Sequence, residues 1–218
     1  MTQLKKSNLA VGSAVLGLVM GLVMVGISLA SVSADPSSSA RASTFPADRN
    51  VVGNPSAKVR MVVYFDFQCS HCMNLYFDVE SQLIERYVAT GKVRLETRPL
   101  GFLGPASQRA AMAAMAAADQ GRYLDYMAAL WRDFRTSGPN AYTDDNLKAL
   151  ASRVGLDRGR FDATYASAAK AAEVKGFESQ ASSQGVKSVP QTFINGRQIV
   201  GEAPLQQFVS VIEQELAK

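Results

Sequence analysis

Residues 60–72 read Arg-Met-Val-Val-Tyr-Phe-Asp-Phe-Gln-Cys-Ser-His-Cys, and this segment is the most informative part of the sequence about the fold. Its first eight residues are rich in β-branched and aromatic side chains, a run that is long enough for a buried strand and too short for a helix. From Ser70 onward, apolar side chains recur every three or four residues until Thr90-Gly91 provides a helix stop. A strand that runs into a helix therefore places a Cys-x-x-Cys pair at the junction.

The segments that follow this junction complete an α/β pattern. Residues 92–98 alternate apolar and polar side chains as a second strand does, and Pro99 with Gly101 breaks that pattern, which predicts a βαβ unit. Two more short strands flank Asn195-Gly196, a dipeptide that favours a tight hairpin turn. Pro204 then opens a last amphipathic helix.

The region between the two groups of strands has a different character. Residues 101–184 are rich in alanine and show little strand pattern, with glycine-containing breaks between stretches of ordinary helix length. We therefore predict that residues 51–100 and 185–218 form one α/β domain. Residues 101–184 are predicted to form an inserted all-helical domain.

The N-terminus has a long apolar segment. Residues 9–30 carry no charge, and at about 1.5 Å per helical residue they would form a hydrophobic helix long enough to span roughly the 30 Å core of a bilayer. Residues 1–34 are therefore predicted to be a transmembrane signal anchor. A cleaved signal peptide is the alternative, because Val32-Ser33-Ala34 offers small residues at a suitable cleavage point.

Both alternatives place the rest of the chain outside the cytoplasm. Lys5 and Lys6 precede the apolar segment and are expected to stay on the cytoplasmic side, so the protein would lie in the periplasm or at the outer face of the cytoplasmic membrane. That compartment is oxidising. Residues 35–50 are rich in Ser, Ala and Pro and poor in large apolar side chains, so we expect a flexible linker.

Composition narrows the chemistry. The net charge of +4 is small and unclustered compared with that of a nucleic-acid-binding protein, so no nucleic acid partner is expected. The chain has two Cys and one His, all within residues 69–72. No second histidine is present for a Ser-His-Asp triad, and too few ligands remain for a zinc site. We therefore expect no metal and no cofactor other than the disulfide of the two cysteines. That disulfide is expected to be redox-active, because a purely structural disulfide that closes so short a loop would stabilise the fold little.

Position assigns different roles to the two cysteines. Cys69 lies where unpaired backbone N–H groups and the helix dipole favour an anion, so it is expected to be the acidic, exposed thiol. Cys72 lies on the apolar face of the helix and is expected to be the shielded, resolving thiol. Ser70 and His71 lie close enough to Cys69 to donate hydrogen bonds or, for a protonated His71, to add positive charge.

Three stretches, taken together, resemble the DsbA family of exported thiol:disulfide oxidoreductases: residues 53–57 (Gly-Asn-Pro-Ser-Ala), 62–72 and 188–196. The resemblance covers essentially all of residues 51–218. It implies a thioredoxin-like fold with an inserted helical domain, here preceded by the N-terminal hydrophobic helix.

The resemblance also implies the roles of individual residues. Cys69 would be the nucleophile, Cys72 the resolving cysteine and Pro190 a cis-proline that faces the disulfide. Val189 would present backbone hydrogen-bonding groups to an extended substrate segment, and Thr192 is expected to contact substrate as well.

Two positions depart from the family pattern. Ser70 stands where many relatives carry Pro, and Val63 stands where an acidic residue often helps to move the proton of the resolving cysteine. Asp66 lies three residues nearer to Cys69. It is a candidate either for that proton-moving role or for a hydrogen-bond acceptor that orients the loop.

The sequence therefore predicts an extracytoplasmic dithiol oxidase that forms disulfide bonds in unfolded or reduced exported proteins. The resemblance implies reoxidation by a membrane partner of the DsbB or VKOR type. A disulfide reductase or isomerase that uses the same cysteine pair is one alternative. The other is a tethered, non-catalytic chaperone-like protein with an apolar groove near Phe102, Leu103 and Pro190.

Overall fold

The computed structural model describes residues 48–218, which belong to one compact unit of the chain. The predicted signal peptide or transmembrane segment at residues 1–34 and most of the predicted linker lie outside the described residues. Within residues 48–218, no helix has both the length and the apolar character that a bilayer crossing requires.

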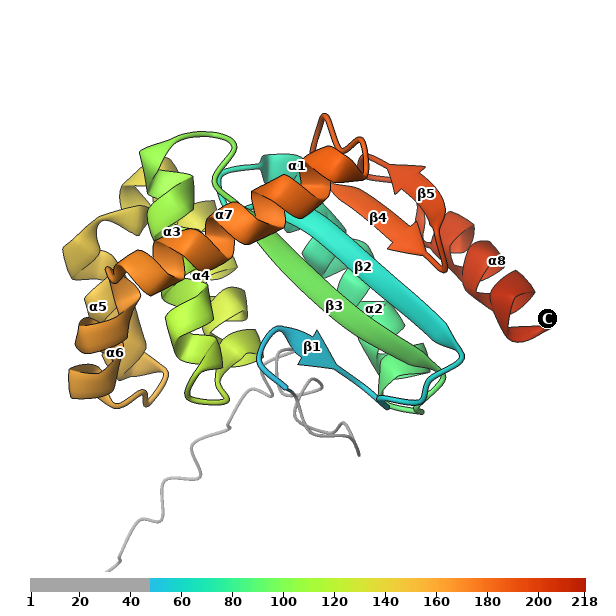
Figure 1. Cartoon of the computed structure of the whole chain (residues 1–218), viewed down its shortest axis with the longest axis horizontal. Coiled ribbons are helices and arrows are strands. Elements are labelled where there is room, and N and C mark those ends of the chain that lie inside the picture. The colour runs from blue at the N-terminus through green and yellow to red at the C-terminus, as the bar shows by residue number, and fades with distance from the viewer. Residues whose placement is uncertain (1–47) are drawn as a thin grey trace, which may run out of the picture. The chain divides into compact units, whose positions relative to one another are not determined.

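A five-stranded mixed sheet carries the fold, in the order β1-β3-β2-β4-β5 (Figure 1). Strands β2 and β3 are parallel, and the other neighbouring strands are antiparallel. The predicted βαβ unit and the hairpin at Asn195-Gly196 are both confirmed. The bounds of the strands are β1 Val51–Val52, β2 Val59–Asp66, β3 Val93–Leu100, β4 Gln191–Ile194 and β5 Arg197–Val200.

The helix after β2 is continuous but contains two π-helical turns. It comprises α1 (Ser70–Leu75), a π turn (Tyr76–Glu80), α2 (Ser81–Leu83) and a second π turn (Ile84–Val88). Its apolar face joins the main core together with the side chains on one face of β2. The C-terminal helix α8 (Leu205–Leu216) begins directly after Pro204, as predicted, and also contacts β2.

The predicted insertion is helical throughout: its elements are α3 (Pro105–Ala118), α4 (Tyr123–Ser137), a 3₁₀ helix (Gly138–Tyr142), α5 (Asp144–Arg153), α6 (Arg158–Tyr165) and α7 (Ala168–Ser183). In Figure 1, α7 leaves the other inserted helices and crosses the sheet on the face opposite to α2. Val62, Tyr64 and Leu100 pack there with Ala181 and Val186 in a second, smaller core. The sheet is thus covered on both faces.

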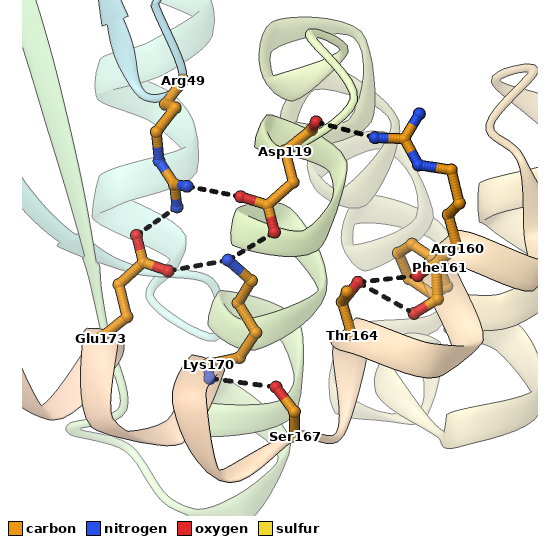
Figure 2. A network of polar contacts seen from close by, with 8 residues as sticks. All are labelled: Arg49, Asp119, Arg160, Phe161, Thr164, Ser167, Lys170 and Glu173. Atoms are coloured by element: carbon orange, nitrogen blue, oxygen red, sulfur yellow. Dashed lines mark hydrogen bonds and ion pairs between the residues drawn. The ribbon is translucent and has the colours of Figure 1, made fainter.

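The predicted linker, residues 35–50, is wrong at its C-terminal end, because residues 48–50 are part of the fold. Arg49 forms ion pairs with Asp119, at 2.5 Å, and with Glu173, and both acids also bind Lys170 (Figure 2). Asn50 is buried and donates a hydrogen bond from Nδ2 to the carbonyl oxygen of Thr97 at 2.7 Å. Polar contacts with distant segments order these residues, and composition alone does not reveal such contacts.

Strand β3 also continues further than the sequence predicts. Pro99 and Leu100 pair with Phe65 and Asp66 of β2, although we expected Pro99 to break the strand. The short strand β1 pairs with Leu95 and Glu96 of β3, so within residues 48–218 no strand pairs with the other edge of β3 at Pro99. A proline is tolerated at such an edge because no partner needs its missing N–H group.

Candidate active site

Cys69 caps the N-terminus of α1, as the strand-to-helix junction predicts. Its backbone is extended, and its sulfur accepts a hydrogen bond from the Cys72 amide at 3.2 Å. Both cysteines are free thiols. The sulfur of Cys69 therefore lies among the unpaired N–H groups of the helix start, where a negative charge is favoured.

The two thiols differ less in solvent exposure than the sequence predicts. Cys72 is 2% exposed, as expected for the inner thiol, but Cys69 is only 8% exposed. In its thiol form, Cys69 donates a hydrogen bond from Sγ to the carbonyl oxygen of Val189 at 3.6 Å. The segment before β4 thus lies against the sulfur that we expected to be openly exposed.

The surroundings of the two sulfurs shift their pKa values in opposite directions. A hydrogen bond from the Cys72 side chain is the main cause that lowers the pKa of Cys69 to about 7, helped by the Cys72 amide and the charge of His71 and opposed by burial. Burial raises the pKa of Cys72, and the neighbouring Cys69 raises it further. Cys69 is therefore the thiol of the pair that ionises first.

The peptide bond between Val189 and Pro190 is cis, as the resemblance implied. Pro190 is buried, and its carbonyl oxygen accepts a hydrogen bond from the Gly201 amide at 2.8 Å. Thr192 does not fit its predicted role as a substrate contact. It is 1% exposed in the middle of β4, between Val63 and Ile199 of the adjacent strands, so its side chain is closed off from a substrate.

The two residues between the cysteines face solvent. Ser70 is exposed, and the His71 side chain is 72% exposed. Nδ1 of His71 lies 2.8 Å from Oε2 of Glu202, an acid in the turn after β5 that also accepts a hydrogen bond from Asn74. Sequence reasoning missed Glu202 because nothing in the pattern links it to a residue 131 positions earlier.

Asp66 holds the loops around the thiols through hydrogen bonds. It is fully buried and accepts hydrogen bonds from the Gln68 amide at 2.7 Å, the Leu103 amide at 2.9 Å and the Ser107 hydroxyl at 2.6 Å. Burial raises the pKa of Asp66, and these hydrogen bonds oppose the effect. Of its two predicted roles, the geometry favours the loop-orienting acceptor.

Two further predictions concern groups near the thiols. Val63, which stands where the family often has a carboxylate, is an apolar core residue with 1% exposure. Among residues 48–218, no three His, Cys, Asp or Glu side chains are arranged to hold a metal ion. The described site thus consists of two thiols, their helix start and the segment before β4.

Comparisons with known proteins agree with this geometry. The thioredoxin family model matches residues 47–214. A thioredoxin-like oxidoreductase from Silicibacter pomeroyi is 26% identical, covers 77% of this chain and 92% of its own, and superposes with a TM-score of 0.67.

Two more distant structures share the fold. BdbD from Bacillus subtilis, in its oxidised form, is 19% identical, with a TM-score of 0.69 over 81% of this chain and 98% of that chain. Alpha-DsbA1 from Wolbachia pipientis is 21% identical, with a TM-score of 0.64 over 80% of this chain and 94% of that chain.

Curated relatives are found within larger proteins. The Na(+)/H(+) antiporter NhaA of Herminiimonas arsenicoxydans is 28% identical over 169 residues, which are 75% of this chain and 25% of the antiporter. NhaA 3 of Salinispora tropica is 31% identical over 153 residues, 69% of this chain and 22% of that protein. The chain therefore spans about a quarter of the length of these relatives.

The family model covers most of the chain, and the structure adds the parallel βαβ unit, the thiol pair at a helix start and the cis-proline opposite that pair. This chain belongs to the thioredoxin family.

Proposed function

We propose that this protein is an extracytoplasmic thiol:disulfide oxidoreductase that forms disulfide bonds in exported proteins. The observation that carries the proposal is the asymmetry of the thiol pair. Cys69 sits at the start of α1 with its pKa lowered to about 7, and Cys72 lies behind it with its pKa raised by burial. No cofactor beyond the disulfide of this pair is needed for thiol exchange.

The reaction begins with the Cys69–Cys72 disulfide. A substrate thiolate attacks Sγ of Cys69, a mixed disulfide forms, and Cys72 leaves as a thiolate that takes up a proton. A second thiolate of the substrate then attacks the substrate sulfur of the mixed disulfide, and Cys69 leaves as a thiolate. Two substrate thiols thus become one disulfide, and their two electrons stay on the reduced Cys69–Cys72 pair.

The contacts of the Cys69 thiolate bear on the direction of electron flow. Hydrogen bonds from the Cys72 amide and side chain stabilise the Cys69 thiolate, which exists only in the reduced protein. Stabilising the reduced form makes the disulfide a stronger oxidant. A disulfide reductase or isomerase with the same pair remains the alternative, and the reduction potential distinguishes the directions.

The surface beside the thiols suits an unfolded polypeptide. Phe102 and Leu103, in the loop that Asp66 holds, are 42% and 54% exposed. The Val189 backbone lies next to Cys69 and would pair with an extended segment. We propose reduced, unfolded exported proteins as substrates, and a membrane reoxidant of the DsbB or VKOR type that takes the two electrons from the pair.

Two cysteine variants test the proposal. Cys69→Ser should abolish the oxidation of a reduced, unfolded test protein, because the attacked sulfur is gone. Cys72→Ser, incubated with a disulfide-bonded substrate, should instead accumulate a mixed disulfide, because the Cys69 thiolate displaces one substrate thiolate and no second protein cysteine releases the product. The adduct is visible as a mass increase that dithiothreitol removes. Full oxidase activity in Cys69→Ser would refute the proposal.

The exposed Phe102 and Leu103 also support the second candidate function, a chaperone-like binding protein. In that case, a Cys69→Ser/Cys72→Ser double variant would suppress aggregation of an unfolded protein as well as the wild type does, and the wild type would show no thiol exchange. Exchange activity in the wild type that is lost in the double variant would favour the oxidoreductase.

A further inference from the structure

The turn after β5 contacts both halves of the thiol site through two consecutive residues. The Gly201 amide donates a hydrogen bond to the carbonyl oxygen of Pro190 at 2.8 Å. The next residue, Glu202, reaches Nδ1 of His71 at 2.8 Å and accepts a hydrogen bond from Asn74 at 3.3 Å. The turn thus ties the cis-proline segment to the start of the helix that bears the cysteines.

The backbone of this turn has a conformation that favours glycine. Gly201 has a φ of +78°, a left-handed conformation that suits glycine and directs the following side chain toward α1. The Glu202 side chain is 34% exposed, so its ion pair with His71 is partly shielded from solvent. Asn74 holds the same carboxylate oxygen, which orients the carboxylate toward His71.

The negative charges near His71 raise its pKa. The hydrogen bond that His71 donates to the Glu202 carboxylate is the main cause that raises the pKa of His71, and the charges of Glu202 and Cys69 add to it. In turn, the charge of His71 lowers the pKa of Cys69, whereas the charge of Asp66 opposes that effect. Glu202 and the Cys69 thiolate thus favour the proton on His71, and that proton favours the thiolate.

We propose that Glu202 is a positioning residue of the thiol site, which holds His71 protonated at the start of α1 and thereby stabilises the reduced form of the Cys69–Cys72 pair. Glu202 transfers neither a proton nor an electron in the exchange. It acts because only the reduced protein carries a negative charge on Cys69, so a fixed positive His71 favours reduction of the disulfide over the oxidised state. This inference rests on the proposed function.

The first test measures the contact itself. The chain has a single histidine, so its NMR imidazole signal reports His71 without assignment. In the full-length reduced protein, we expect the pKa of His71 to lie above the ordinary value of about 6.5, and Glu202→Gln to return it close to that value. Glu85→Gln removes an exposed acid further along the same helix and should leave the His71 titration unchanged. An unchanged titration in Glu202→Gln would overturn the proposal.

The second test measures the redox consequence. At pH 7, Glu202→Gln should lower the equilibrium constant for reduction by glutathione about three- to tenfold. This is at or below the tenfold lower limit of what a neighbouring opposite charge does to a pKa, because the His71 side chain is largely exposed. Near pH 5, the variant and the wild type should agree, because His71 is protonated in both. A loosened turn would instead shift the constant equally at both pH values, and that outcome would refute the electrostatic role.

A double-mutant cycle completes the design. In a His71→Gln background, Glu202→Gln should leave the equilibrium constant unchanged. In the wild-type background, Glu202→Asp should keep part of the stabilisation of the reduced form that Glu202 provides. An undiminished effect of Glu202→Gln without His71 would contradict the proposal. A wild type that fails to equilibrate with glutathione would overturn the proposed function instead, and the NMR titration would still decide whether Glu202 holds the proton on His71.

Discussion

Glu80 is a buried acid on the helix that carries the thiols, and it should make the stability of the protein depend on pH. It ends the first π turn and is 5% exposed, and its Oε1 atom has no hydrogen-bond partner among residues 48–218. Burial alone raises its pKa from 4.5 to about 7. An ionised carboxylate with an oxygen that lacks a partner is costly to bury.

The size of the effect follows from the two pKa values. In the unfolded chain Glu80 ionises near 4.5 and in the folded protein near 7, a difference of about 2.5 that corresponds to about 3 kcal/mol. Because the folded-state pKa is raised, the folded protein binds this proton more tightly. The free energy of unfolding should therefore fall as the pH rises from 4.5 to 7, and the full penalty should be present above pH 7.

Glu80→Gln should remove this penalty. We expect the variant to be more stable than the wild type by up to about 3 kcal/mol at pH 8 and to show no such gain at pH 4.5. Urea unfolding of the reduced, full-length protein at both pH values measures the difference. Glu85→Gln, five residues further along the helix and exposed, is the matched control. If Glu80→Gln and the wild type lost equal stability between pH 4.5 and 8, the reasoning would be refuted.

Two other substitutions test the loops beside the thiols and the start of β3 at the opposite end of the strand. Asp66→Asn should cost about 2 kcal/mol of stability, because charged hydrogen bonds are lost. It should also lower the pKa of Cys69, because the charge of Asp66 raises that pKa. Urea unfolding measures the first effect and the thiolate absorbance the second, and an unchanged or higher pKa of Cys69 would count against this electrostatic role. Gly53→Ala should destabilise the protein by about 2 kcal/mol, because Gly53 has a φ of +106° and an added Cβ would lie 2.6 Å from the carbonyl oxygen of Val93. A midpoint of urea unfolding equal to that of the wild type would show that the strand end adapts.

Much of the fold could be predicted from local patterns. The run before Cys69 formed β2, the change of period at Ser70 marked the helix start, and Asn195-Gly196 formed the hairpin turn, with a positive φ at both residues. These features depend on neighbouring residues, so the sequence carries them directly. The burial of Cys72 followed from its place on the apolar face of the helix.

The errors share a different cause, which is contact between distant segments. Arg49 is ordered by acids on α3 and α7, and Pro99 stays in β3 because the strand has an unpaired edge there. Glu202 reaches His71 only because the hairpin returns the chain to the start of α1. Thr192 was expected to contact substrate, but its strand lies between two others.

The central claim is that the Cys69–Cys72 pair accepts electrons from substrate thiols. Its most direct test is the equilibrium reduction potential of the full-length protein in glutathione buffers. If the pair accepts electrons from substrate thiols, the potential should lie above about −180 mV, in the direction of the roughly −120 mV of a strong disulfide donor. A value near −270 mV, typical of a reducing thioredoxin, would contradict the account and reverse the proposed direction of electron flow.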